Sequence, residues 1–104
     1  MSNPPQISNE ARRAALEKAA NYRKERAKFK KEIAEGTRGW REAIESQSEA
    51  ISRMRVKELL EAMPGFGSIR AQAILDRVGI SSTRRIKGLG STQRKKLEEE
   101  LKGR

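Results

Sequence analysis

The sequence predicts an all-α protein in which a long N-terminal helix precedes a compact helical domain. Apolar residues recur at steps of three and four along much of the chain, and no useful stretch alternates with the period of two that a strand requires. Glycine, proline and serine interrupt the pattern repeatedly after residue 35, which indicates short helices joined by turns. Because 37% of the residues are charged and 4% are aromatic, the core must be small and mostly aliphatic.

The N-terminal helix is expected over residues 10–35, after a flexible tail at residues 1–9. Strong helix formers fill the helical range without glycine or proline, and Ser8 or Asn9 can cap its start. Its apolar row is thin, and alanine dominates the first half. The row consists of Ala15, Ala19, Tyr22, Phe29 and Ile33. We therefore expect only the C-terminal half of this helix to pack on the rest of the protein, while the first half projects.

The compact domain is expected over residues 37–104. Gly36 ends the first helix, and Thr37 is predicted to cap the next one. An amphipathic row with one polar position follows, and the serines within residues 46–52 predict a break in it. The row consists of Trp40, Ile44, Gln47, Ile51 and Met54. At this spacing Trp40 is assigned to the core rather than to stacking on a base.

The next two helices are bounded by proline and glycine. A short helix over residues 55–63 ends at Pro64, because proline cannot continue a helix. Its inward residues are Val56, Leu59, Leu60 and Met63. A second helix is predicted from Ser68 to Val78, with a Schellman-like end at Gly79 and Ile80. Its inward residues are expected to be Ile69, Ala73, Ile74 and Val78.

The chain closes with a basic turn and one more helix. Residues 81–83 are predicted to cap a one-turn helix that carries Arg84, Arg85 and Lys87 outward and Ile86 and Leu89 inward. The last helix opens at Ser91 and buries Leu97 and Leu101 before Gly103.

One short phrase occurs twice in the second half of the chain. Gly65-Phe66-Gly67-Ser68 and Gly88-Leu89-Gly90-Ser91 each open onto a predicted helix. Glycine lets the backbone adopt positive φ and come close to another molecule, and the serine is a good N-cap. The start of a helix offers free N–H groups and a positive dipole end, which together bind phosphate. Two such turns indicate a grip on a phosphate backbone.

The charge of the chain fits the same interpretation. The net charge is +10, with a pI near 10.5, and it points to a polyanion such as nucleic acid or an acidic membrane surface. Between Pro64 and Lys96 only Asp76 opposes the basic residues, and it is expected to pair with Arg77 on the surface. These basic residues are Arg70, Arg77, Arg84, Arg85, Lys87, Arg94, Lys95 and Lys96.

Several classes of protein are disfavoured by composition. The chain has no cysteine and no histidine, so it lacks disulfides, thiolate metal sites and the usual metal ligand and general base. No apolar run approaches the length of a membrane span. The first ten residues lack the basic and apolar regions of a signal peptide, so a cytoplasmic location is expected.

The motifs resemble known DNA-binding folds. Residues 60–67, with Arg70-Ala71 and Ile74-Leu75, resemble the helix–hairpin–helix motif. Residues 65–90 are similar to the helix–two-turns–helix domain of S13-type ribosomal proteins and formamidopyrimidine glycosylases. Together with the basic N-terminal helix and the lead-in at residues 54–61, the chain resembles the actinobacterial-type integration host factor family. Phe66 and Ser68 depart mildly from the pattern, and Ser68 removes one phosphate contact.

The resemblance implies a nucleoid-associated protein that binds double-stranded DNA with little sequence preference and supports compaction, bending and recombination. It implies no small-molecule substrate, no membrane partner, and no cofactor other than a monovalent cation that the hairpin carbonyls at residues 63–66 could hold. We expect a monomer located in the nucleoid. The candidate DNA-binding residues are Pro64, Gly65, Gly67, Ser68, Ile69, Arg70, Arg84, Arg85, Lys87, Gly88, Gly90, Ser91 and Arg94.

The basic N-terminal helix is a candidate second DNA surface, separate from the turns. Its candidate residues are Arg12, Arg13, Arg23 and Arg26. The alternative is a solvated face on which Glu17, Glu25 and Glu32 neutralise the neighbouring bases through i,i+4 pairs.

Three other functions compete with DNA binding. RNA binding in the manner of a ribosomal protein is the leading alternative, since the same turns suit an A-form helix. A repair enzyme would need a nucleophile such as an N-terminal proline, and Pro4 and Pro5 are not N-terminal, so no enzyme activity is predicted. An amphipathic membrane binder would need a bulkier apolar face than the N-terminal helix has.

Overall fold

The computed structural model describes residues 8–104, and in this range it is helical without a strand. The helices are α1 (Asn9–Glu35), α2 (Trp40–Ile44), α3 (Glu49–Ser52), α4 (Val56–Ala62), α5 (Ser68–Val78) and α6 (Ser91–Leu101), with a short 3₁₀ helix, η1, at Ile86–Gly88. The all-α prediction is confirmed. No helix in the described range is both long and apolar enough to cross a membrane.

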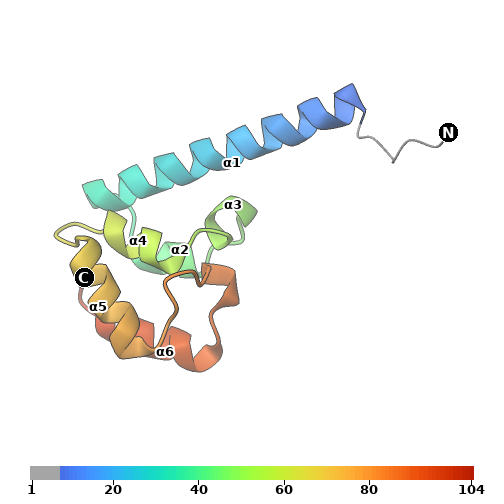
Figure 1. Cartoon of the computed structure of the whole chain (residues 1–104). Helices are drawn as coiled ribbons and strands as arrows, with labels where there is room; N and C mark the ends of the chain where they lie inside the picture. Colours follow the sequence, from blue (N-terminus) through green and yellow to red (C-terminus); the bar gives the residue numbers. More distant parts are fainter. Residues whose placement is uncertain (1–7) are drawn as a thin grey trace.

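Helix α1 projects well beyond the body formed by the other helices (Figure 1). Ser8 caps its start by accepting the N–H of Ala11 at 3.1 Å, and Gly36, at φ 80°, ends it. The expected flexible tail at residues 1–9 lies mostly outside the described residues, and Asn9 already belongs to the helix. Only Phe29 and Ile33 of α1 are buried. The prediction that the first half projects is therefore confirmed.

Polar contacts also attach α1 to the body. Tyr22 donates to Glu49, Ser48 donates to Glu25, and Lys30 pairs with Glu58 at 2.9 Å. The hydrogen bond between Tyr22 and Glu49 raises the pKa of the tyrosine phenol and lowers the pKa of the carboxyl group. Two glutamates of α1 thus bind other segments: Glu25 holds Ser48, and Glu32 pairs with Arg38 at 3.2 Å.

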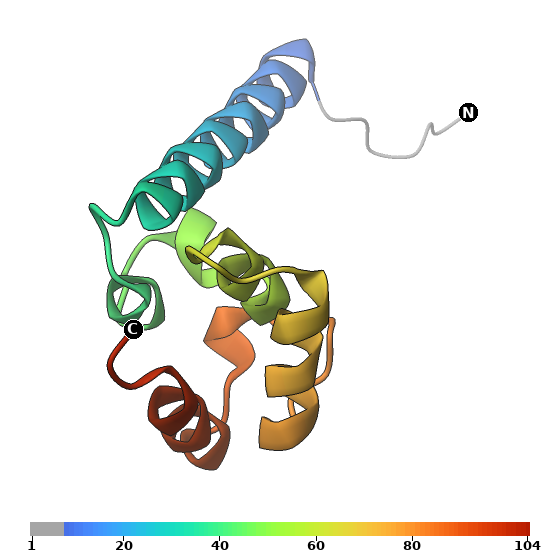
Figure 2. The same cartoon turned by 90° about the vertical axis from the view of Figure 1, so that its left-hand side faces the viewer.

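The helices of the body, drawn as ribbons in Figure 2, pack around one mostly aliphatic core. Trp40 is buried, as predicted, and Met54, Val56, Leu59, Leu60, Leu75, Leu97 and Leu101 are inaccessible to solvent. The break predicted among the serines lies between α2 and α3, where Ser48 caps α3. Gln47 falls within this break and is exposed, which is why it does not continue the apolar row.

Two predictions about helix starts and faces are wrong. Thr37 does not cap α2; its hydroxyl donates to the carbonyl of Glu32, and Gly39 is the N-cap, with its N–H bound to Glu42. On α5 the buried residues are Ala71, Ile74, Leu75 and Val78, at spacings of three and four. This face leaves Ile69 and Ala73 exposed, and Ile69 retains 88% of its accessible surface.

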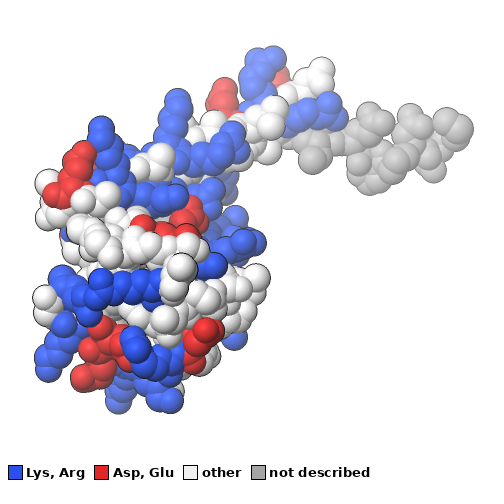
Figure 3. Space-filling view, turned by 60° about the vertical axis from the view of Figure 1, so that its left-hand side comes forward, with Lys and Arg blue, Asp and Glu red and all other residues white. Residues whose placement is uncertain are grey.

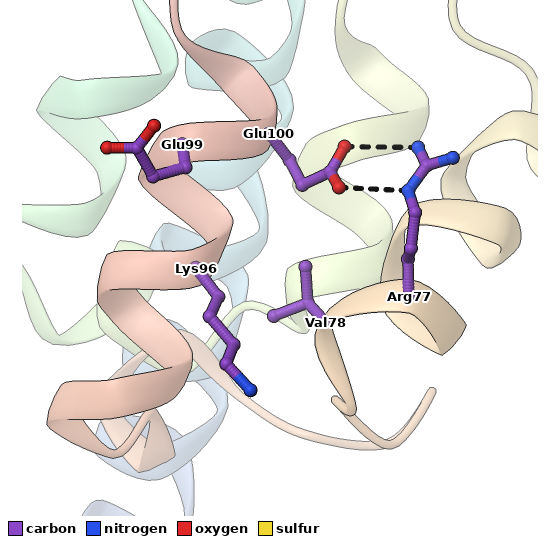
Figure 4. A pocket seen from close by; sticks show the side chains of 5 residues that line it. All are labelled: Arg77, Val78, Lys96, Glu99 and Glu100. Atoms are coloured by element: carbon purple, nitrogen blue, oxygen red, sulfur yellow. Dashed lines mark hydrogen bonds and ion pairs between the residues drawn. The ribbon is translucent and has the colours of Figure 1, made fainter.

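Helices α5 and α6 are joined by an ion pair that the sequence did not predict. Arg77 donates to both carboxylate oxygens of Glu100 at 2.9 and 3.0 Å across a shallow hollow that Lys96 and Glu99 also line (Figure 4). Asp76, expected to pair with Arg77, instead accepts from Gln72 one turn earlier. Gln72 and Asp76 are four residues apart on one helix, so their side chains lie side by side on its surface.

The attachment of α1 gives a stability prediction. We expect Ile33→Ala to lower the free energy of unfolding by about 2–5 kcal/mol, because it removes buried methyl groups and leaves a cavity between α1 and the body. Leu16→Ala, on the projecting half where Leu16 is 65% exposed, should change it by less than about 0.5 kcal/mol. Urea unfolding followed by circular dichroism measures both, and equal losses would contradict this description of the docked half.

Candidate nucleic-acid interface

The first turn connects α4 to α5 through residues 63–67. Phe66 donates its N–H to the carbonyl of Met63 at 3.0 Å, Pro64 occupies the second position, and Gly65 has φ 78°. This is the residue pattern of a type II turn, and the positive φ explains the glycine at its third position. Pro64 and Gly65 are exposed, so the turn is open to another molecule.

The helix starts differ from the prediction. Gly67 and Gly90, not the serines, are the N-caps of α5 and α6, and Ser68 and Ser91 are the first helical residues. Both glycines have negative φ, so backbone conformation does not require glycine at either. At Gly67 a β-carbon would meet nothing within 4 Å. What the missing side chain provides there is open access to the N–H groups of the first helical turn, which no side chain caps in α5.

Arg70 lies beside the first turn. Its guanidinium stacks on the Phe66 ring, with 4.8 Å to the ring centroid, and donates to the carbonyl of Gly65 at 3.4 Å. The guanidinium of Arg104 lies 5.4 Å from the same ring. The Gly65 carbonyl belongs to the segment considered for a monovalent cation, and the structure gives it a cationic partner from the chain itself. Phe66 thus anchors positive charge at this turn.

The second turn, residues 81–90, holds a basic hollow of about 370 Å³. Hydroxyl, guanidinium and ammonium groups line this hollow together with backbone atoms. The lining residues are Ser81, Thr83, Arg84, Arg85, Lys87 and Gly88. The predicted one-turn helix carrying Arg84 and Arg85 is wrong in its position, because η1 begins only at Ile86. The reason is an antiparallel bridge that pairs Arg85 with Arg55 and keeps this segment extended.

The glycines of the second turn have separate roles. Gly88 lies under Arg84, whose Cδ atom would be 3.2 Å from an added β-carbon, and its carbonyl accepts from Arg84 at 3.2 Å. Gly90 donates to the side chain of Gln93 at 3.2 Å, so the start of α6 is partly satisfied internally. Arg94, one turn into α6, is exposed and forms a long ion pair with Glu98 at 3.5 Å.

The structure does not bring the two turns together. In Figure 1 the first turn lies at the start of α5, and the second turn, which contains η1 (orange), lies toward the opposite side of the body. Pro64, Gly65, Gly67, Ser68, Ile69 and Arg70 therefore form one exposed group, and Arg84, Arg85, Lys87 and Gly88 form another. The exposed Ile69 lies among the first group, on the first turn of α5.

The bases of α1 divide into two sets. Arg12, Arg13 and Arg23 are exposed on the projecting helix. Arg26 is half-buried and lines a hollow together with Arg85, so the expectation of a surface wholly separate from the turns does not hold for Arg26. Figure 3 shows basic side chains both along α1 and across the body below it.

Arg53 and Arg55, which are not among the candidate residues predicted from the sequence, line the same hollow as Arg26. The sequence feature that could have indicated them is the order Arg53-Met54-Arg55, in which two basic residues flank a completely buried one. A locally extended segment points such neighbours to the side opposite the core, whereas the sequence pattern at these residues predicts helix.

Comparison with known proteins identifies the family. The family model described as the S13-like H2TH domain matches residues 41–101. The integration host factor of Streptomyces coelicolor is 44% identical over 103 residues, covering 97% of this chain and 95% of that protein. Those of Mycolicibacterium smegmatis and Mycobacterium tuberculosis are 41% identical, covering 93% of this chain and 94% of theirs.

The chain belongs to the integration host factor family. A solved structure, that of sIHF bound to an 8-base-pair palindromic DNA, matches with a TM-score of 0.78 and 42% identity, over 82% of this chain and 98% of that one. The family resemblance seen in the sequence and the helix–two-turns–helix prediction are both confirmed.

Proposed function

We propose that this integration host factor family member binds double-stranded DNA in the nucleoid through phosphate contacts and acts as an architectural protein without catalysis. The observation that supports this most directly is the hollow of the second turn, where three basic residues and two hydroxyl residues surround an exposed backbone turn. A relative of 42% identity was solved with DNA bound, which favours duplex DNA over the RNA alternative.

The geometry favours weak sequence preference. The exposed N–H groups at the start of α5 and the bases of the second turn suit phosphate oxygens, which carry no sequence information. Arg84 and Arg85 are exposed on an irregular segment and can also reach into a minor groove, where arginine senses groove width rather than an exact sequence. Binding of this kind suits compaction, because one protein can then occupy many sites along the DNA.

The first test is a titration of the full chain against random duplex DNA over a range of salt concentrations. Neutralising about five to seven phosphates should give a slope of about −4.5 to −6 for log K against log salt. Structured RNA and anionic vesicles serve as comparisons, and both should bind more weakly. A slope near zero, or equal affinity for vesicles, would refute phosphate-mediated DNA binding.

The second test concerns the second turn. Arg84→Ala with Arg85→Ala should weaken DNA binding at least tenfold, because it removes two guanidinium groups from the hollow, while the fold persists because both side chains are exposed. Fluorescence anisotropy measures binding, and circular dichroism measures helicity. Lys24→Ala with Lys31→Ala, an equal loss of charge at two exposed positions of α1, is the control. Unchanged binding in the first variant would place the DNA surface elsewhere.

We also propose that the outer part of α1, with Arg12, Arg13 and Arg23, forms a second DNA surface. Deleting residues 1–20 should leave the core intact, because the buried residues of α1 are Phe29 and Ile33. Affinity for a single duplex should then fall only modestly, whereas bridging between duplexes, measured by sedimentation or microscopy, should disappear. A truncated protein that bridges DNA as well as the full chain would show that the outer helix is only a soluble extension.

A further inference from the structure

A hollow of about 200 Å³ lies between α1 and the second turn, and four arginines form most of its wall. They come from three separate segments: Arg26 from α1, Arg53 and Arg55 from the stretch between α3 and α4, and Arg85 from the second turn. Glu58 of α4 is the remaining lining residue. We refer to this feature as the four-arginine hollow.

Three of the four arginines in the four-arginine hollow have no ion-pair partner among the described residues. Glu58 is already paired with Lys30 at 2.9 Å, and Arg53 is paired with Glu49 at 2.6 Å. Within residues 8–104, no acidic side chain forms an ion pair with Arg26, Arg55 or Arg85. Three unpaired guanidinium groups around one hollow repel one another, and this repulsion is strongest at low salt.

Backbone geometry forces two of these charges together. Arg55 and Arg85 lie opposite each other in an antiparallel bridge, fixed by the N–H of Val56 on the carbonyl of Arg84 and the N–H of Ile86 on the carbonyl of Met54, both at 2.9 Å. Like charges at directly opposed positions are destabilising. Arg85 is also held by its own hydrogen bond to the carbonyl of Arg53 at 3.4 Å. The hollow is therefore a fixed concentration of positive charge that the fold tolerates at a cost.

We propose, on the basis of the proposed function, that the four-arginine hollow binds a phosphate group of the DNA backbone. It thereby joins the part of α1 around Arg26 to the DNA surface of the second turn. Guanidinium groups match phosphate oxygens with paired hydrogen bonds, and they occur wherever planar recognition of phosphate is needed. A phosphate in this hollow removes the repulsion between Arg26, Arg55 and Arg85. Because Arg26 belongs to α1, the same phosphate also holds the helix against the body.

The neighbouring charges extend this surface in both directions. The hydrogen bond from Tyr22 is the largest cause of the lowered pKa of the Glu49 carboxyl group, and the charge of Arg53, followed by those of Lys18 of α1 and Lys87 of the second turn, lowers it further. Basic residues of α1 and of the second turn therefore act on the same α3 carboxylate.

The test compares two double variants that lose the same charge. Arg26→Gln with Arg55→Gln empties half of the hollow and spares Arg85, whereas Lys24→Gln with Lys31→Gln removes two exposed charges elsewhere on α1. The first variant should bind random duplex DNA about tenfold more weakly at moderate salt, and the slope of log K against log salt should become shallower by about 1. The control should change affinity less than about threefold. An unchanged slope in the first variant, or equal losses in both, overturns the proposal.

A second measurement detects the hollow without DNA. Inorganic pyrophosphate should raise the Tm of the wild-type chain and of the control at low salt, and this rise should be largely lost in Arg26→Gln with Arg55→Gln. An equal rise in all three proteins overturns the proposal even if DNA binding is affected. The single variant Arg55→Gln gives the same comparison should the double variant lose helicity. Failure of the wild-type chain to bind duplex DNA would instead refute the proposed function, which the pyrophosphate measurement does not test.

Discussion

The functional surface depends on two backbone hydrogen bonds between segments that are about thirty residues apart in the chain. The N–H of Val56 binds the carbonyl of Arg84, and the N–H of Ile86 binds the carbonyl of Met54. The second turn contains only three residues of 3₁₀ helix, so it has little regular structure to fix its shape. Because Met54 and Val56 are fully buried, the bridge anchors the turn directly to the core. The positions of the basic residues between Arg84 and Lys87 follow from that anchor. Because these hydrogen bonds are buried, the loss of either one is costly.

The distribution of charge shows how a lean core coexists with a strongly basic surface. Acidic side chains are used where elements join: Glu25, Glu49 and Glu58 tie α1 to the body, and Glu100 ties α6 to α5. The bases of the second turn have no such partner in the described residues. The turns and α1 thus carry exposed positive charge that is not paired within the described residues, and a polyanion relieves the resulting repulsion.

The sequence predicts the helices correctly where the spacing of apolar residues agrees with the positions of glycine, proline and serine. The long helix, the break at the serines, Trp40 in the core and the helix ends at Gly36 and Gly79 all followed from local rules. It failed where a tertiary contact decided the local structure. Arg84 and Arg85 are extended because their backbone pairs with residues 54–56 at the start of α4. No local sequence pattern reveals that bridge. The hollow lined by Arg26, Arg53 and Arg55 depends on how α1 packs against the body. The sequence indicates that packing only through the two bulky apolar residues Phe29 and Ile33.

The misplaced helix caps carry the clearest functional meaning. A serine at the N-cap of α5 would accept one of the N–H groups that begin the helix, and a phosphate would then have to displace its hydroxyl. With Gly67 at that position no side chain caps α5, and its first N–H groups stay available to an outside acceptor. At α6 the side chain of Gln93 accepts the N–H of Gly90, so that helix start is partly satisfied by the chain itself. The repeated glycine phrase therefore encodes two unlike sites: an open helix start at the first turn, and a basic hollow at the second in which side chains rather than backbone carry the charge.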